Sequence, residues 1–387
     1  MARPISLDPP RSLLSDVPPV HFYDGGKSGR CPEDIPFFSC VRSWLEHNGG
    51  SLGCTHAETP DKRTGCTYAL LMTLCGYSGS AAWNPGQWDH GFSALDARWD
   101  DVRVPIDQTL QGIVRSGSLV GNADRQGRPG SIEGLDTRAD ESAMRHLVAE
   151  TIAEGQPLLA FGVVGPPECC LICGYEEGGD VLVGWSFFTE WEQNDPDVDL
   201  DPSGMFRRRN WYPNTLALLT ISPQTRTDWT IPYREMVERN LAALHAQPVG
   251  PFVTGIAVWD AWAHDLESET RFGSDDLEVL MNLHMPHTDA VGNVAEARWY
   301  GCLALREAAV HLPEAKAEIR AAADCYKQQH DLMWNIWNAA GGNGIGETLA
   351  RALAEPSARQ AILPLMAQAK SLDIQAAVHL ERALAKL

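Results

Sequence analysis

The residue of this chain that is best suited to act as a nucleophile is Cys40. It precedes the segment VRSWLEHNGG, whose apolar residues recur at helical spacing before a glycine pair. Ser39 is a typical N-cap residue, so we expect Cys40 in the first turn of a helix. Unpaired N–H groups and the helix dipole favour the thiolate there, and the thiolate is the reactive form of cysteine. The alternative is that Cys40 packs beneath the helix as a small apolar residue.

The second candidate is Glu168, which opens the apolar run ECCLICGY. A carboxylate at the mouth of an apolar strand is either solvated at the edge or held in a cleft with a shifted pKa. A desolvated Glu168 with a pKa near neutrality could exchange a proton with a nearby nucleophile or leaving group. The three cysteines of this run are expected to behave as small hydrophobic residues.

A polar loop, residues 51–66, holds three potential metal ligands: Cys54, His56 and Cys66. Their C-x-H spacing, with a single cysteine ten residues later, matches no common structural zinc site, so we predict no metal here. Cys66 with His56 is an alternative nucleophile pair, because Cys66 precedes the apolar helical run 68–74.

A second possible metal pair is His284 and His287, which frame Met285-Pro286. Proline interrupts a helix, so we expect the two imidazoles not to share one helical face. The sequence therefore predicts no metal and no cofactor.

Aromatic residues follow the 68–74 run in the glycine-rich segment GYSGSAAWNPGQW. Aromatic side chains in such a segment can line a ligand cleft, although they also cover hydrophobic cores. The candidate substrate-binding residues are Tyr77, Trp83 and Trp88, with Trp185 from a predicted strand.

An antiparallel sheet is expected to position these groups. Residues 155–188 read as three strands, 157–164, 168–175 and 180–188, separated by a Gly-Pro-Pro break and a Glu-Glu-Gly-Gly turn. Glycine accepts a positive φ without steric cost, which suits a hairpin turn. We further expect a strand at 215–222 and helices at 104–116 and 141–154.

The composition changes near residue 229 to Ala, Leu, Glu and Trp at helical spacing, which predicts a helical bundle. The fold class is therefore α+β: a proline-rich extended arm at 1–34, an α+β domain at 35–225 and an all-α domain at 226–387. The expected helices of the last domain are 231–245, 254–264, 274–283, 291–311, 312–339, 346–354 and 357–387.

The net charge is −20, from 51 acidic and 31 basic residues, which argues against binding to nucleic acid or to an anionic membrane surface. The sequence contains no run of about 18 apolar residues, so it predicts no membrane-spanning helix. The proline-rich N-terminus does not resemble a signal peptide, so the ten cysteines are expected to be reduced thiols in the cytoplasm.

The order of these elements resembles the papain-like cysteine-enzyme superfamily. A helix that starts at a cysteine (FSCVRSWL) is followed by a helical insertion and then by a hairpin whose second strand begins with an ionisable residue (ECCLICGY). The chain is most similar to bacterial bacteriocin-processing peptidases and to the butirosin-biosynthesis protein H acyltransferase group. In these, a papain-like domain precedes a helical region, so the resemblance covers the whole chain in architecture.

The resemblance implies that a cysteine at the helix N-terminus attacks a carbonyl, that a histidine opening the second strand is its base, and that a carboxylate or amide orients the imidazole. Cys40 matches the nucleophile position. The histidine position falls on Glu168 or Cys169, and the orienting position falls near Trp185-Ser186, where neither residue is Asp or Asn. No glutamine precedes Cys40 to complete the usual oxyanion hole.

Two functions follow from these residues. Glutamate has no cationic form that could stabilise a thiolate, so ordinary peptidase activity is not expected. The first function is acyl transfer or amide-bond chemistry on a small-molecule or peptide-like substrate in bacterial secondary metabolism, with Cys40 as nucleophile and Glu168 as the proton-handling group. The alternative is a non-catalytic relative that binds a small molecule or peptide in the residual cleft.

Overall fold

The computed structural model describes residues 6–20, 33–50, 63–86, 114–125, 137–189, 192, 194–223, 231–248 and 250–387. The chain divides into two compact units. Residues 1–52 and 96–230 form the α+β unit, and residues 53–95 and 231–387 form the helical unit. Mixed α and β structure with a mostly antiparallel sheet and a helical C-terminal region agrees with the expected α+β class.

The expected boundary is 225/226, and the two compact units meet at 230/231; the interval 53–95, expected in the α+β domain, belongs to the helical unit. Its helix α2 (Arg63–Leu74) contacts α9 (Leu277–His311). Every described side chain of α2, from Thr67 to Leu74, is buried. A helix that is apolar on all sides needs neighbours on all sides, and the helical unit supplies them.

Three strands of the α+β unit form the antiparallel meander that the sequence predicts: β5 (Leu158–Phe161), β6 (Cys169–Glu176) and β7 (Val181–Trp185). Gly178 and Gly179 turn the chain between β6 and β7 at φ 68° and 93°. The strand order is β4-β3-β10-β5-β6-β7-β9-β8, with β1 also paired to β6. The other strands are β1 (Ser12–Leu13), β3 (Val114–Asn122), β4 (Arg138–Ala139), β8 (Val198–Leu200), β9 (Phe206–Arg209) and β10 (Ala217–Pro223).

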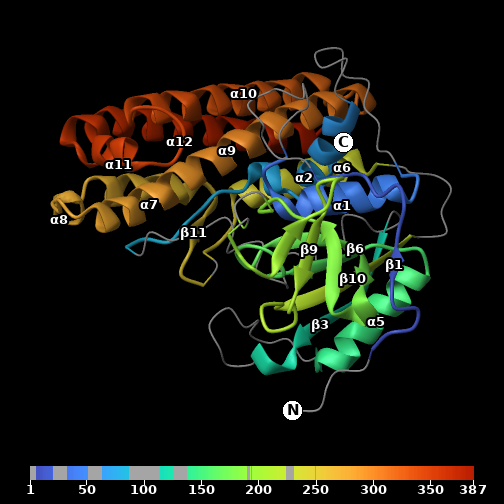
Figure 1. The fold of residues 1–387 in the computed structure, drawn as a ribbon. Helices are drawn as coiled ribbons and strands as arrows, with labels where there is room; N and C mark the ends of the chain where they lie inside the picture. Colours follow the sequence, from blue (N-terminus) through green and yellow to red (C-terminus); the bar gives the residue numbers. More distant parts are fainter. Residues whose placement is uncertain are drawn as a thin grey trace. The chain divides into compact units, whose positions relative to one another are not determined.

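Two helices cover opposite faces of this sheet, α1 (Pro36–His47) and α5 (Glu141–Ala153) (Figure 1). Side chains alternate between the faces of a strand, so Cys170 and Ile172 of β6 join the core beneath α5. Helix α5 confirms the helix expected at 141–154. The helix expected at 104–116 is wrong in its described part, since β3 begins at Val114 and pairs with the central strand β10.

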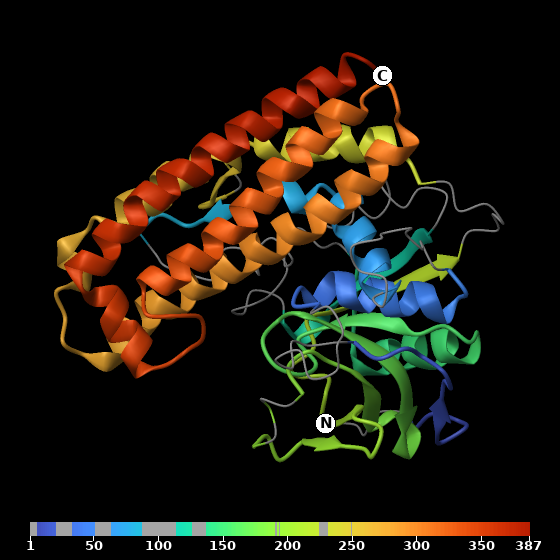
Figure 2. The same cartoon turned by 90° about the horizontal axis from the view of Figure 1, so that it is seen from above.

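The helical unit is built on α9, α10 (Lys316–Ala339) and α12 (Pro356–Leu384), which run alongside one another (Figure 2). None of the helices in the described ranges is long and apolar enough to cross a membrane. The remaining elements of this unit are η1 (Tyr77–Gly79), β2 (Ala82–Trp83), α6 (Tyr233–Leu244), β11 (Val253–Thr254), η4 (Gly255–Ala257), α7 (Val258–Leu266), α8 (Glu269–Phe272) and α11 (Glu347–Ala354).

Helix α9 corrects one expectation: it continues through Pro286, where the sequence predicts a break. Proline inside a helix costs about 3 kcal/mol. Leu283, Pro286 and His287 are buried, so packing of this part of α9 in the bundle opposes that cost. His284 and His287 are therefore three residues apart in one helix and share a face, contrary to the sequence-based interpretation.

Candidate functional site

Cys40 lies one turn inside α1 rather than at its N-terminus. The helix begins at Pro36, with Ile35 at the N-cap position. Proline suits the first helical position because the N–H that it lacks would have no helical partner there. Ser39 is thus an interior residue, and the expectation that it caps the helix is wrong. The helix-terminus argument for a Cys40 thiolate does not apply.

Cys40 is enclosed within the α+β unit. Its side chain is 0% exposed, and Sγ donates to the backbone carbonyl of Cys169 at 3.7 Å. Only the protonated thiol can donate this hydrogen bond. Burial also raises the pKa of Cys170 to about 12, and it raises the pKa of Cys173 well above the ordinary range. Burial therefore disfavours the thiolate forms of Cys170 and Cys173.

Glu168 immediately precedes β6 and is half-buried. A tight loop holds its backbone: Gly162 N–H donates to the Glu168 carbonyl at 3.1 Å, and Glu168 N–H donates to the Pro166 carbonyl at 2.6 Å. Gly165 has φ 78°, and a Cβ there would lie 2.6 Å from Phe188. The start of β6 thus has a defined position, and Cys40 contacts the residue that follows Glu168.

No described histidine of the α+β unit bonds to Cys40. His47 Nε2 lies 3.1 Å from the Gly155 carbonyl, and His146 Nδ1 lies 2.9 Å from the Ser142 carbonyl. Both rings are thus bound to backbone groups elsewhere in the unit.

Sequence reasoning missed a buried ion pair next to Cys40. Arg42 is 0% exposed, and its Nε and Nη2 donate to Glu33 Oε2 at 3.0 and 2.7 Å. Ser39 Oγ donates to the same carboxylate oxygen at 2.8 Å. Burial raises the pKa of Glu33 to about 7, while Arg42 and Ser39 act to lower it. Arg42 Nη2 also donates to the Pro19 carbonyl at 2.8 Å, so this network fixes the N-terminal segment to α1.

The predicted substrate-binding aromatics are divided between the two units. Trp185, in the α+β unit, is half-buried and donates from Nε1 to the Val17 carbonyl at 3.3 Å. Tyr77 and Trp83 belong to the helical unit, where both are buried. Trp88, Cys54 and His56 lie outside the described residues, as does the side chain of Cys66.

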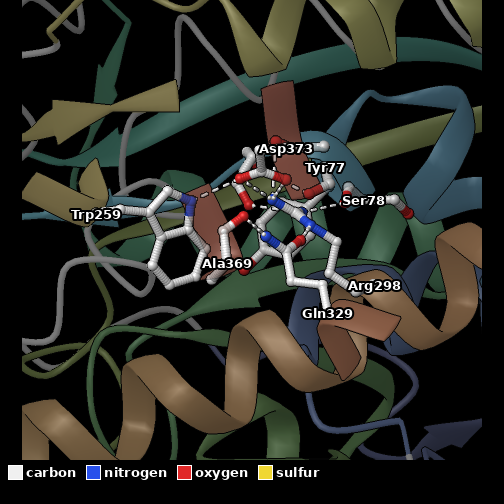
Figure 3. A network of polar contacts seen from close by, with 9 residues as sticks. Tyr77, Ser78, Trp259, Arg298, Gln329, Ala369 and Asp373 are labelled. Atoms are coloured by element: carbon white, nitrogen blue, oxygen red, sulfur yellow. Dashed lines mark hydrogen bonds and ion pairs between the residues drawn. The ribbon is translucent and has the colours of Figure 1, made fainter. Parts of the chain in front are cut away.

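A larger polar network organises the helical unit around Arg298 (Figure 3). This fully buried side chain donates from Nη2 to both oxygens of Asp373, at 3.1 and 3.3 Å, and from Nε to the side chain of Gln329. Its guanidinium also binds the carbonyls of η1 and the next residue: Ser78, Gly79 and Ser80. Arg298 therefore joins η1 to α9, α10 and α12.

Three parallel indoles lie in the same unit. Trp83 stacks on Trp262 with ring centroids 4.9 Å apart, and Trp262 stacks on Trp259 at 5.9 Å. Each indole N–H has a buried acceptor. Trp83 donates to Asp265 at 2.9 Å and Trp262 donates to His287 at 3.1 Å. Trp259 donates to Asp373 at 2.7 Å. Trp83 is thus packed in the core of the helical unit, which is the alternative to a ligand-lining role.

The sequence carries a weak signal for these networks, namely charges inside apolar helical runs. Arg42 alone interrupts SCVRSWL, and Arg298 interrupts AEARWYG together with Glu296. A charge at such a position needs a partner if it is buried. Their partners Glu33 and Asp373 do not interrupt comparable apolar runs, so the sequence does not identify them as the partners.

No arrangement of three or more His, Cys, Asp or Glu side chains fit to hold a metal occurs in the described ranges. Comparison with known proteins finds no family model that matches the chain and no curated protein that matches its sequence.

Proposed function

We propose that the α+β unit is a papain-like scaffold in which Cys40 is not a nucleophile, and that the protein binds a small molecule or peptide-like ligand without transforming it. The observation that carries this proposal is the complete burial of the Cys40 thiol with its S–H donated to the Cys169 carbonyl. A nucleophilic cysteine needs access to the substrate and a positive neighbour that stabilises its thiolate.

The charged residues of this part of the unit also support a non-catalytic role. Glu168, at the position where the resemblance places a histidine, would disfavour a nearby thiolate. Arg42, the cation in the same helix, is bound by Glu33 and by Glu46, to which Nη1 donates at 3.0 Å.

Alkylation of the native protein with iodoacetamide, followed peptide by peptide with mass spectrometry, tests this proposal. Cys75 is a matched internal control, because it is a half-buried cysteine of the same chain. We expect Cys40 to react about tenfold more slowly than Cys75, or slower still. Rapid labelling of Cys40 with a midpoint below about pH 8 would overturn the proposal.

Acyl transfer through Cys40 is the second candidate, and one observation favours it: Cys40 contacts the first residue of β6, directly after Glu168. Incubation with an acyl thioester and intact-mass measurement discriminates between the two functions. A thioester adduct that forms on the wild type, disappears in Cys40→Ala and slows in Glu168→Gln would support acyl transfer. Under the binding proposal no adduct forms.

A further inference from the structure

Two histidine nitrogens in the helical unit are buried without a hydrogen-bond partner among the described residues. They are His284 Nδ1 and His287 Nε2, on side chains that are each 1% exposed. An unmet polar atom in a buried site costs about 1–3 kcal/mol, so a pair of them on one helix face calls for an explanation.

The tautomer of His287 follows from its partner. Trp262 Nε1–H can only donate, and it lies 3.1 Å from His287 Nδ1, which must therefore accept. Burial lowers the pKa of His287 to about 3, so the ring is neutral and its proton is on Nε2. His287 thus offers one unused N–H donor.

The tautomer of His284 is the opposite. Its Nε2 lies 3.1 Å from the Gly344 carbonyl, which can only accept, so Nε2 carries the proton. Burial also lowers the pKa of His284. The unused Nδ1 therefore offers a lone pair, one helical turn from the unused donor of His287.

This combination of a donor and an acceptor selects the ligand by charge. A metal ion would be repelled by the N–H of His287, whose lone pair is already used by Trp262. A carboxylate or phosphate would be repelled by the lone pair of His284. A hydroxyl group satisfies both, since one oxygen can accept from His287 and donate to His284.

A glycine-rich loop borders His284. Gly341, Gly342 and Gly344 have φ 97°, 129° and 121°, and a Cβ added at Gly342 would meet no atom within 4 Å. Thr288 and His284 both bind the Gly344 carbonyl, and Ile345 beside it is 59% exposed. A Cβ added at Gly341 or Gly344 would meet Leu349, at 3.2 and 3.7 Å, so the loop is packed at these positions and open at Gly342.

The geometry points to a binding site for the hydroxyl group of a small neutral molecule between His284 and His287. This site lies within the helical unit, so it stands whether or not Cys40 is a nucleophile.

Titration of the whole protein with 2-propanol and, separately, with acetone tests this inference, with the histidine ring-nitrogen NMR shifts as the readout. The two probes share a carbon skeleton, but acetone can accept a hydrogen bond and cannot donate one. We expect 2-propanol to shift His284 Nδ1 and His287 Nε2 saturably, with half-saturation at about tenfold lower concentration than acetone, which corresponds to one hydrogen bond.

His330 is an internal control in the same spectra. Its Nδ1 lies 2.8 Å from the Ala295 carbonyl and its Nε2 accepts from Trp334 at 3.2 Å, so both nitrogens are occupied and should not respond. The variant His287→Phe should lose the 2-propanol response, while His330→Phe should keep it. Equal responses to the two probes, or none, would leave only an ordered water between the rings and overturn the inference. This comparison of probes on the wild type does not depend on either variant folding.

Discussion

The two units bury an arginine in different ways. Arg42 of the α+β unit takes its partners from its own helix and from short segments nearby in the sequence: Glu33, Glu46 and Pro19. Arg298 of the helical unit binds residues from η1, α10 and α12, which are far apart in the sequence. The first network can form locally, whereas the second exists only when the whole unit has assembled.

The units also differ in how completely their candidate functional groups are satisfied. The Cys40 thiol is fully buried and donates to the Cys169 carbonyl. His284 and His287 each keep one ring nitrogen that has no hydrogen-bond partner in the described part of the chain. The two proposals together predict that an unmet polar atom in the folded protein marks a site better than a reactive residue type in a suggestive sequence position does.

The largest effect is expected from Arg298→Leu. It leaves Asp373 buried without its counter-ion, so the helical unit should lose about 3–5 kcal/mol. Arg42→Leu should cost less, because Glu33, whose pKa is about 7, can take up a proton instead. Hydrogen exchange measures the two losses of stability, in α9 and α12 peptides for Arg298→Leu and in α1 peptides for Arg42→Leu. Equal losses of stability would contradict the proposed difference between the two networks. Arg306→Leu, which removes a surface pair with Asp324, is the control.

Acidification should change the stability of the two units in opposite directions. The pKa of His287 is about 3 in the folded state and ordinary in the unfolded state, so the unfolded chain binds more protons. Its contribution to stability is present above about pH 6.5 and lost as the pH falls, by about 2 kcal/mol at pH 5. The raised pKa of Glu33 has the opposite sign: its contribution is present below its ordinary pKa and lost as the pH rises through about 7.

Hydrogen exchange between pH 7 and pH 5, corrected for intrinsic rates, tests this difference. The helical unit should open more readily at the lower pH, and His287→Phe should flatten its dependence. A larger opening of the α+β unit at low pH would contradict the assignment of neutral, buried imidazoles.

A smaller effect is expected from Trp83→Phe. It removes the hydrogen bond to Asp265 and weakens the stack on Trp262. The helical unit should therefore lose about 1–2 kcal/mol of stability. Near-ultraviolet circular dichroism should also lose intensity, because the coupling among the three indoles is reduced. An unchanged spectrum would show that Trp83 is not part of the stack in solution. Trp334→Phe is the comparison, because it also removes an indole hydrogen bond, to His330, and an aromatic pair, with Trp337, but at a side chain that is 40% exposed.

The smallest effect is expected from Cys40→Ala. The change deletes one buried sulfur and a weak hydrogen bond, so the α+β unit should lose about 1 kcal/mol. Thermal unfolding of the Cys40→Ala and Cys75→Ala variants, each compared with the wild type, measures the loss of stability. A gain in stability would show that Cys40 is held under strain, as a functional nucleophile can be.

The sequence predicts the central meander and most of the C-terminal helices, because their apolar patterns and glycine turns are local signals. It does not reveal the assignment of residues 53–95, because a helix buried on all sides reads the same in either domain. Pro286 misleads for a related reason: tertiary packing overrides the local preference for a break. The partners of Arg42 and Arg298, and the unmet nitrogens of His284 and His287, depend on three-dimensional neighbours that no spacing encodes.

The path of the chain has a consequence for synthesis on the ribosome. Helix α2 emerges early, but α9, against which it packs, is made only after the α+β unit is complete. During that interval its apolar side chains lack their final neighbours and are natural substrates for chaperones. A chain ended at residue 230 would stay in this state, so we expect it to remain bound to chaperones, whereas removal of residues 53–95 from the same fragment should release it.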